Sequence, residues 1–535
     1  MSPNTSSSKF RNLPLSTSGP IDCALTGAAL LNSAYLNKGS AFPAEERRQF
    51  NLTGLLPQGI QTLDQQCKRA YQQYSTRADD LAKNTFLTSL NDQNEVLYYK
   101  IDGEEILGIG DQGVGGVLIS VAKLVLTTLC GGIHPNRALP VVLDCGTDNE
   151  DLINDDLYLG LRVKRVRGER YDNFVDTFVS AARKLYPKAY IHFEDFGLHN
   201  ARRILDQYRP KFACFNDDVQ GTGCVTLAAI MAGLHVSNQK LGDIRMVVFG
   251  AGSAGVGIAD QVRDAIAAEG GITHEEAAKQ IWLIDKPGLL TTAIDTSEAQ
   301  KGFAKDASEW KDKDTTLLSV IETIQPNVLI GTSTVPGAFT EPIVRAMAKH
   351  TPRPIILPLS NPTRLHEAKP ADLLAWTDGK ALVATGSPFD PVTGPWGDSG
   401  ADVTIDIAEC NNSVVFPGIG LGCVLARVEH LTDRMLVAAV EGLAALSPAL
   451  ADSTAPLLPD VSSVRDVSVR IARCVIQTAV EEGEATEEAI PSSDEELEEW
   501  IREQMWNPVY RPLKFVKMEG ATRAARGELK RVGTI

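Results

Sequence analysis

Four carboxylates come directly after two apolar runs in the stretch 190–226, and carboxylates are the groups that hold hard divalent cations. The runs cover residues 189–193 and 212–215, and a segment of helical character joins them. The four acids are Glu194, Asp195, Asp217 and Asp218. If both runs are strands of one parallel sheet, their carboxyl ends meet at one edge. Crowded acids repel one another, so the pattern predicts an all-oxygen site for Mg²⁺ or Mn²⁺. The alternative is that the acids merely end the strands.

The elements that must position these acids belong to a large globular chain. At 535 residues we expect two to four domains. A hydrophobic fraction of 43% and a charged fraction of 22% are typical of globular proteins, and no apolar window is long enough to cross a bilayer. The net charge of −16 and the lack of a basic stripe argue against nucleic acid. We therefore expect neither nucleic acid nor membrane as a partner.

The cysteines and the N-terminus bear on the compartment. Nine cysteines occur singly, without a C-x-x-C pair, so we expect neither a zinc site nor a disulfide framework, and we expect a reducing compartment. Residues 1–21 contain no acid and are rich in Ser and Thr, which predicts a disordered tail, with an organellar transit peptide as the alternative. The expected location is cytoplasmic, with the mitochondrial matrix left open.

Lys123 lies in an otherwise apolar helical run, VLISVAKLVLTTLCGG. A buried ammonium must be paired or lose its proton, because desolvation lowers a lysine pKa, and such a lysine can act as a general base. The alternative is a lysine that reaches the rim of the core. The glycines Gly108, Gly110 and Gly113 before this run form a G-x-G-x-x-G pattern, which alone is weak evidence for a dinucleotide site.

A second glycine pattern is better placed, since it lies between the strand-like run IRMVVF and a helical stretch. Such a turn presents helix N–H groups to a pyrophosphate. The expected dinucleotide-binding residues are Gly250, Gly252, Ser253, Ala254 and Gly255. The next run ends on Asp285, which can accept hydrogen bonds from the adenosine ribose and so favours NAD. Lys286 beside it leaves NADP open.

Later apolar runs keep the strand–helix rhythm and end on neutral polar residues. These are Ser333, Asn361, Ser387, Asn411 and Asn412. An amide can orient a carboxylate without adding charge, although a single Asn more often caps a turn. The run LPVVLD predicts another strand, and the polar loop 144–149 after it is a candidate for the same cleft. The basic segment 161–171 more often coats a surface than binds phosphate.

Nine segments together resemble the malic enzymes of bacteria, fungi and animals, in that family's order, from about residue 36 to about residue 511. They are NKGSAFPAEERRQFNLTGLLP, GEEILGIGDQGVGG, LPVVLDCGTDN, HFEDFG, FNDDVQGT, FGAGSAGVGIA, LSNPT, ATGSPF and NNSVVFPGIGLG. The resemblance implies oxidative decarboxylation of L-malate to pyruvate and CO₂ with reduction of NAD or NADP. It also implies a homodimer or homotetramer.

The resemblance assigns roles residue by residue. It implies metal ligands at Glu194, Asp195 and Asp218, a general base at Lys123 and an assisting Asp217 beside the metal. Asn361 and Asn412 match the amides that contact substrate, and we expect Asn361 to contact the cofactor as well.

The expected architecture is α/β, with a helical N-terminal region, a parallel-sheet substrate domain and a Rossmann-type NAD(P)-binding domain. The expected boundaries are a tail at 1–21, the helical region at 22–100, the substrate domain at 101–216 completed by 412–480, the NAD(P)-binding domain at 217–411, and a C-terminal helix and arm at 481–535.

The chain departs from this family in one stretch. Malic enzymes carry a V-Y-T-P-T-V-G segment whose tyrosine is taken as the general acid, but here Ile101 runs straight into Asp102, so several tens of family residues are absent. Glu105 also stands where relatives usually have a substrate-clamping arginine, and a carboxylate cannot make that contact. Either the written sequence omits a coding stretch, or the protein turns over poorly. The alternatives to a malate-oxidising enzyme are an oxaloacetate decarboxylase and a catalytically silent nucleotide-binding subunit.

Overall fold

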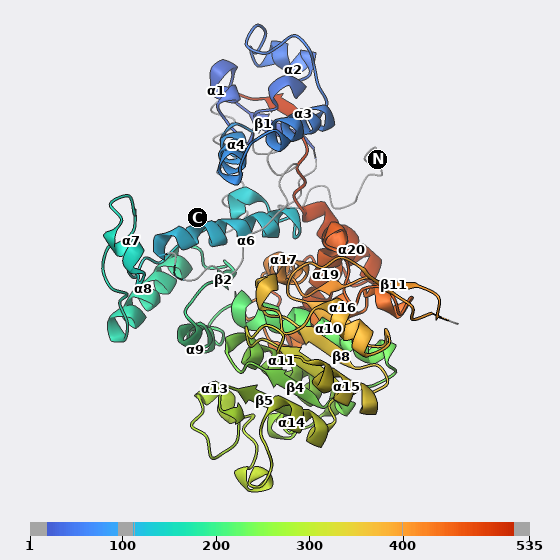
Figure 1. Cartoon of the computed structure of the whole chain (residues 1–535). Coiled ribbons are helices and arrows are strands. Elements are labelled where there is room, and N and C mark those ends of the chain that lie inside the picture. Colours follow the sequence, from blue (N-terminus) through green and yellow to red (C-terminus); the bar gives the residue numbers. More distant parts are fainter. Residues whose placement is uncertain (1–18, 95–110, 112, 398–399, 518–535) are drawn as a thin grey trace. The chain divides into compact units, whose positions relative to one another are not determined.

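The computed structural model describes residues 19–94, 111, 113–397 and 400–517 (Figure 1). It divides into two compact units, and the division falls within helix α6 (Val117–Leu129). The first unit comprises residues 1–106, 122–139 and 491–535, and the second comprises residues 107–121 and 140–490. Residues 1–18 of the tail expected at 1–21, the junction between Ile101 and Asp102, and Glu105 lie outside the described residues.

The first unit is mostly helical. Its helices are α1 (Gly27–Leu31), α2 (Ala44–Gln49), α3 (Leu63–Ser75), α4 (Asp80–Gln93) and α20 (Asp494–Gln504). Two short strands far apart in the sequence, β1 (Ile21–Cys23) and β13 (Leu513–Phe515), pair in parallel. Buried Glu46 forms an ion pair with Lys38 at 2.6 Å and accepts a hydrogen bond from the Leu513 backbone N–H at 3.0 Å. The C-terminal arm is therefore fastened to the N-terminal helices.

The second unit contains the short βαβ segment that the sequence predicts. Its elements are β2 (Ile191–Phe193), α9 (Leu198–Tyr208) and β3 (Cys214–Asn216), preceded by α7 (Glu150–Asn154) and α8 (Glu169–Leu185). Strands β2 and β3 pair in parallel. Tyr171, Val175 and Val179 recur on one face of α8 and share a buried cluster with Phe193 and Phe212. The predicted crossover unit is thus confirmed, with α8 packed against it.

The strand expected at LPVVLD does not form. Residues 139–144 have no assigned strand, and the backbone that follows pairs with its own loop instead. Thr147 N–H donates to Val163 O at 3.0 Å, and Val166 N–H donates to Cys145 O at 2.8 Å. A strand needs a hydrogen-bonded neighbour along its edge, and apolar sequence alone does not supply one. Leu139 and Val141 are accordingly exposed, at 67% and 41%.

A seven-stranded sheet forms the core of the second unit, in the order β12-β9-β8-β7-β4-β5-β6. The strands are β4 (Met246–Phe249), β5 (Ile281–Asp285), β6 (Gly288–Leu289), β7 (Val328–Gly331), β8 (Ile355–Pro358), β9 (Leu382–Thr385) and β12 (Ala408–Glu409). Every pairing is parallel except that of β5 with β6. The order of the strands reverses between β4 and β7, because β5 and β6 lie on one side of β4 and the later strands on the other, and doubly wound sheets bind ligands at such a point.

Helices cover both faces of this sheet. They include α10 (Thr222–Val236), α11 (Ser253–Gly270), α12 (His274–Ala278), α13 (Glu298–Lys301), α14 (Leu317–Ile324), α15 (Glu341–His350) and α16 (Pro370–Trp376). Val247, Leu329 and Ile356 share one buried cluster with residues of α14, α15 and α16. Ile355 points to the opposite face, because its Cδ1 lies 2.8 Å from where a Cβ on Gly233 of α10 would be. The near-continuous apolar strands are explained by this two-sided burial.

The remaining helices of this unit pack closely on one another. They are α17 (Phe416–Ala426), α18 (Asp433–Ala444) and α19 (Val464–Glu482), and a hairpin of β10 (Val392–Gly394) and β11 (Val403–Ile405) precedes them. A Cβ on Gly418 or Gly422 would lie within 3 Å of Ile471 or Val475, so only glycine permits this approach of α17 to α19.

One helix among the described residues, Asp217–Val236, is long and apolar enough to cross a membrane, but 78% of its apolar window is buried inside the protein. It contacts α11 and α18, as a core helix does. The nine cysteines all fall in the described part of the chain, and none forms a disulfide.

Candidate metal and dinucleotide site

The register of β2 and β3 brings the predicted carboxylates together. Phe193 pairs with Asn216, so the residues that follow the two strands are neighbours. One carboxylate oxygen each of Glu194, Asp195 and Asp218 lies within 4.8 Å of the others. The Asp195 backbone N–H donates to Asp218 Oδ2 at 2.9 Å. The three residues expected to ligate a cation therefore form one cluster.

Unusual backbone shapes both edges of this carboxylate cluster. Asp195 has φ +57°, the left-handed region that non-glycine residues seldom adopt. After β3, Asp217–Gly221 form a single π-helical turn, η4, whose N-terminus is capped by Asn216 Oδ1 accepting from Val219 N–H at 3.0 Å. A Cβ on Gly221 would lie 1.9 Å from Asp217 Oδ1, so glycine makes room for that carboxylate. Both features are common at functional sites.

The electrostatics of the cluster favour a bound cation. Burial, followed by the charges of Glu194 and Asp217, raises the pKa of Asp218 to about 7. Asp217 is fully buried, and Asn412 Nδ2 donates to its Oδ2 at 3.1 Å. A divalent cation would relieve the repulsion among these acids, and oxygen donors at this spacing suit Mg²⁺ or Mn²⁺. The residues present therefore fit such an ion.

His192 is a site residue that the sequence analysis missed. Its Nε2 lies 3.2 Å from Glu194 Oε2, and His192, Glu194 and Asp217 form a second set whose ligand atoms lie within 4.8 Å of one another. The signal was present, because residues two apart on a strand point to the same side.

The second glycine pattern forms the turn that the sequence predicts. Gly250 follows β4 with φ +107°, and α11 begins at Ser253 with Gly252 as its N-cap. A Cβ on Gly255 would lie 2.0 Å from Gly250 O, and one on Gly250 would lie 2.5 Å from the Thr332 carbonyl carbon after β7. The turn thus sits tightly packed at the point where the strand order reverses, with the N-terminus of α11 available to an anion.

The helix that follows the glycine turn packs directly against the turn that carries two of the carboxylates. A Cβ on Gly257 of α11 would lie 2.6 Å from Val219 O in η4. The helix that begins at the dinucleotide turn therefore packs against the turn that carries Asp217 and Asp218. The two halves of the expected site belong to one rigidly packed part of the second unit.

The other expected cofactor and substrate residues lie at strand ends of the same sheet. Asp285 is the last residue of β5, and its Oδ1 accepts from Lys286 N–H at 2.8 Å. Asn361 follows β8, and its Oδ1 accepts a hydrogen bond from Ser387 after β9. His366 Nε2 lies 3.4 Å from the same Ser387 hydroxyl. The hydrogen bond holds the Asn361 side chain against Ser387.

Lys123 lies on α6 and belongs to the first unit, whereas the carboxylates and the glycine turn belong to the second. Its side chain is buried, with the residue 9% exposed, as the apolar run around it predicts. The assignment of Lys123 as general base remains a prediction. Of the first glycine pattern, Gly108 and Gly110 lie outside the described residues.

The polar loop 144–149 and the basic segment 161–171 are joined by hydrogen bonds and an ion pair. Asp144 accepts hydrogen bonds from Gly146 and Leu161 N–H groups at 3.0 and 2.8 Å, and Arg167 pairs with Asp148. Arg165 pairs with Asp111 at 2.7 Å, which contributes to lowering the pKa of that acid to about 2, against burial. These contacts support the interpretation of the basic segment as surface, and Asp144 serves its own loop.

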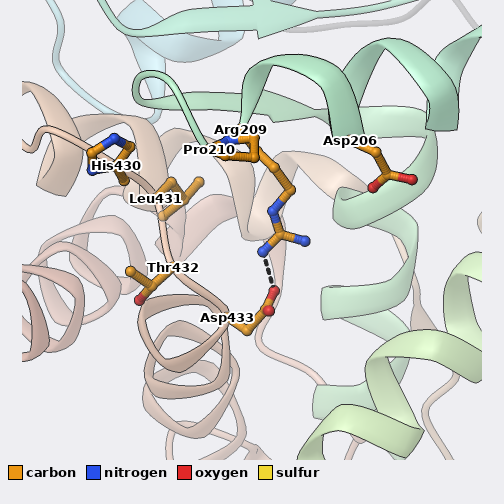
Figure 2. A pocket seen from close by; sticks show the side chains of 7 residues that line it. All are labelled: Asp206, Arg209, Pro210, His430, Leu431, Thr432 and Asp433. Carbon is orange, nitrogen blue, oxygen red and sulfur yellow. Dashed lines mark hydrogen bonds and ion pairs between the residues drawn. The ribbon is translucent and has the colours of Figure 1, made fainter.

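Figure 2 shows a separate cavity of about 460 Å³ in the second unit. Its lining residues are Asp206, Arg209, Pro210, His430, Leu431, Thr432 and Asp433. Arg209 pairs with Asp433, and Asp206 pairs with Arg202 at 3.0 Å. The cavity shares no residue with the carboxylate cluster or the glycine turn, and its charges are already partnered.

A doubly wound sheet with a glycine-rich turn at its reversal point, packed against a cluster of carboxylates, defines a dinucleotide-binding α/β protein with a candidate metal site. Residues 219–480 match the family model "Malic enzyme, NAD binding domain", and residues 55–209 match "Malic enzyme, N-terminal domain". The chain belongs to the malic enzyme family.

Similar proteins agree with this membership. The mitochondrial NAD-dependent malic enzyme of Saccharomyces cerevisiae is 44% identical, with 93% of this chain and 85% of that protein covered. NAD-dependent malic enzyme 3 of Bacillus subtilis is 42% identical, with 95% and 100% covered. The crystal structure of the Entamoeba histolytica malic enzyme matches with a TM-score of 0.56 over 90% of this chain and 93% of that one, at 20% identity, and so shares the fold.

The alignments also bear on the expected gap. Each of the two sequence alignments runs over 579 positions, which is 44 more than the 535 residues of this chain. The two relatives therefore each carry at least 44 residues that have no counterpart here. This agrees with the absence of several tens of family residues.

Proposed function

We propose that this chain oxidises L-malate and decarboxylates it to pyruvate and CO₂, with reduction of NAD and with Mg²⁺ or Mn²⁺ held by Glu194, Asp195 and Asp218. The observation that carries the proposal is the packing of the carboxylate cluster against the helix of the glycine turn, at Val219 and Gly257. NAD is preferred to NADP because Asp285 would repel a 2′-phosphate. We further propose a homodimer or homotetramer, in the cytoplasm or the mitochondrial matrix.

The chain's own residues account for binding and proton transfer. Asn412 would orient the substrate carboxylate while it also holds Asp217. Asn361, whose side chain is hydrogen-bonded by Ser387, would hold the nicotinamide end of the site. Lys123 would take the hydroxyl proton, with Asp217 assisting. A cation at the cluster would supply polarisation of the alcohol and stabilisation of developing enolate charge.

Protonation of the product enolate is the weak step in this chain. The family tyrosine taken as the general acid is absent from the sequence, and the length of the alignments supports a true gap in the sequence as written. We therefore propose that the chain binds NAD and Mn²⁺ but forms pyruvate slowly. Stopped-flow measurement of NADH formation with malate, Mn²⁺ and NAD tests this, and a rate typical of intact relatives would contradict the impairment.

Two further assays separate the alternatives. Malate-dependent NADH absorbance distinguishes a malate-oxidising enzyme from an oxaloacetate decarboxylase and from a silent subunit. Release of CO₂ from oxaloacetate without nucleotide identifies the decarboxylase. Sequencing the genomic DNA and the transcript around the codons for Ile101 and Asp102 decides whether a coding stretch has been omitted.

A further inference from the structure

His192 lies beside the proposed metal ligands without being one of the three residues expected to bind the ion. It is the second residue of β2, and Glu194 directly follows that strand. Its Nε2 is 3.2 Å from Glu194 Oε2, a hydrogen bond that the imidazole donates when Nε2 carries the proton. The one contact therefore ties the ring to a carboxylate of the cluster.

The ring of His192 packs against aromatic side chains, of which Phe215 and Phe416 are the nearest. Phe215, its cross-strand partner on β3, lies with ring centroids 5.4 Å apart and planes at 62°. Phe416 at the start of α17 lies at 5.4 Å and 78°. Edge-to-face contacts of this kind fix the plane of a ring. The imidazole is therefore oriented by packing, before any ion binds.

We propose that His192 is a positioning residue of the metal site, and that its Nε2–H holds the Glu194 carboxylate in the orientation that the divalent cation requires. This inference rests on the proposed function, since it concerns the same ion. Carboxylates that bind metals are commonly hydrogen-bonded by a neighbouring group, and loss of that group typically weakens metal binding by 10- to 100-fold.

The mechanism makes a specific prediction about metal selectivity. A residue that acts through Glu194 affects every oxygen-preferring ion in the same way, because the atoms bound to the ion remain carboxylate oxygens. A nitrogen ligand would instead favour Mn²⁺ over Mg²⁺, since imidazole suits the transition metals. The ratio of Mn²⁺ to Mg²⁺ affinity therefore separates positioning from direct ligation.

Three single variants of the full chain isolate the N–H group. His192→Phe keeps an aromatic ring between Phe215 and Phe416 but removes the donor. His192→Gln removes the ring but keeps an N–H donor. Tyr190→Phe, directly before the same strand, removes a buried hydroxyl that has no hydrogen-bond partner among the described residues and serves as the matched control. Thermal unfolding without metal reports whether each variant is folded.

The readout is the affinity for Mn²⁺ and for Mg²⁺, measured by titration calorimetry in the absence of substrate and nucleotide. His192→Phe is expected to bind both ions about 10- to 100-fold more weakly, with their ratio unchanged. His192→Gln and Tyr190→Phe are expected to stay close to the wild-type affinity. Rescue by glutamine would exclude a purely structural role for the ring.

Four results would overturn the proposal. His192→Phe could bind Mn²⁺ as tightly as the wild type, or His192→Gln could be as weak as His192→Phe. A directly coordinated nitrogen in the electron spin echo spectrum of bound Mn²⁺ would make His192 a ligand instead. If the wild-type chain binds neither ion, the metal assignment in the proposed function fails together with this inference. If the wild type binds the ions and His192→Phe binds them equally tightly, only this inference fails.

Discussion

Asn412 Nδ2 donates a hydrogen bond to Asp217 Oδ2 across 3.1 Å, although 195 residues separate the two in the chain. The same amide nitrogen also lies 3.2 Å from Thr222 Oγ1. Asp217 is completely buried, so its carboxylate depends on such donors in place of water. This contact joins the start of the 3₁₀ turn before α17 to the π-helical turn of the carboxylate cluster.

Replacing Asn412 by alanine should therefore cost both stability and substrate binding. Loss of one donor to a buried carboxylate is expected to lower the free energy of unfolding by about 1–3 kcal/mol, measured in urea. The KM for malate should rise, because the amide would no longer orient the substrate carboxylate.

The neighbouring Asn411 provides the matched control. Asn411 caps the same turn through Ser413 N–H at 2.9 Å and donates to Glu409 at 3.1 Å. Asn411→Ala should cost about 1 kcal/mol of cap stability and leave the KM unchanged. Equal effects of the two variants on the KM would contradict a special role for Asn412.

Asp218→Asn should stabilise the metal-free chain and abolish its response to metal. The substitution removes one of the mutually repelling charges that, with burial, raise the pKa of Asp218 to about 7. The same charge is needed to hold a cation. The measurement is the melting temperature above pH 7 with chelator and with saturating Mn²⁺.

Wild-type protein should gain several degrees with Mn²⁺, whereas Asp218→Asn should melt higher without the ion and show no gain. Asp206→Asn removes a carboxylate that pairs with Arg202 in a different place and should respond to Mn²⁺ like the wild type. If the metal-free Asp218→Asn protein melts at a lower temperature than the wild type, repulsion among the carboxylates is not the main effect of the Asp218 charge on stability.

The sequence predicts those parts of the site that follow from local periodicity. Acids after two apolar runs, a crossover between them and a glycine turn after a strand are short-range patterns, and the structure contains each of them at Glu194, Asp218 and Gly250. The pairing of β1 with β13 could not be predicted in this way, because three-residue strands separated by most of the chain carry no local signal.

Two other features depended on tertiary context. The apolar run at 139–144 looks like a strand, but a strand exists only through its neighbours, and here it is the backbone after the run, at Cys145 and Thr147, that bonds to the following loop. The role of His192 depends on one hydrogen bond and two aromatic contacts. The sequence shows only that His192 stands two residues before Glu194.

Substitutions at two glycines of the glycine turn should have different effects, one on folding and the other on nucleotide binding. Gly255→Ala would place a Cβ 2.0 Å from Gly250 O, so the turn must open and the protein should be destabilised. A Cβ on Gly252 would meet no atom within 4 Å, so Gly252→Ala should fold normally but bind NAD more weakly, since this glycine lets the backbone approach the pyrophosphate.

Thermal melting and fluorescence titration with NADH measure the two effects. Gly242→Ala, also in open space at a site outside the turn, should match the wild type in both. Wild-type NADH affinity in Gly252→Ala would contradict the assignment of this turn to the pyrophosphate.

Lys305 should make the stability of the NAD-binding sheet depend on pH. Burial lowers the pKa of Lys305 to about 7, whereas a lysine in the unfolded chain has its ordinary pKa of 10.5. Between these values the unfolded chain binds the proton and the folded chain does not, so the free energy of unfolding rises as the pH increases from about 7. Below that range the folded chain carries the full cost of a buried ammonium.

The variant Lys305→Met removes this titration and tests it. The Lys305 Nζ lies 4.6 Å from the centre of the Trp282 ring and donates hydrogen bonds to the carbonyls of Ala278 and Lys279 at 2.9 and 3.0 Å. A methionine side chain can donate neither hydrogen bond. The difference in unfolding free energy between wild type and Lys305→Met should therefore favour the wild type increasingly as the pH is raised from 7 toward 10. Urea unfolding at a series of pH values measures it. If the difference in unfolding free energy stays constant over this pH range, Lys305 remains charged in the folded chain. The Trp282 ring and the two carbonyls would then stabilise the ammonium enough to offset the cost of its burial.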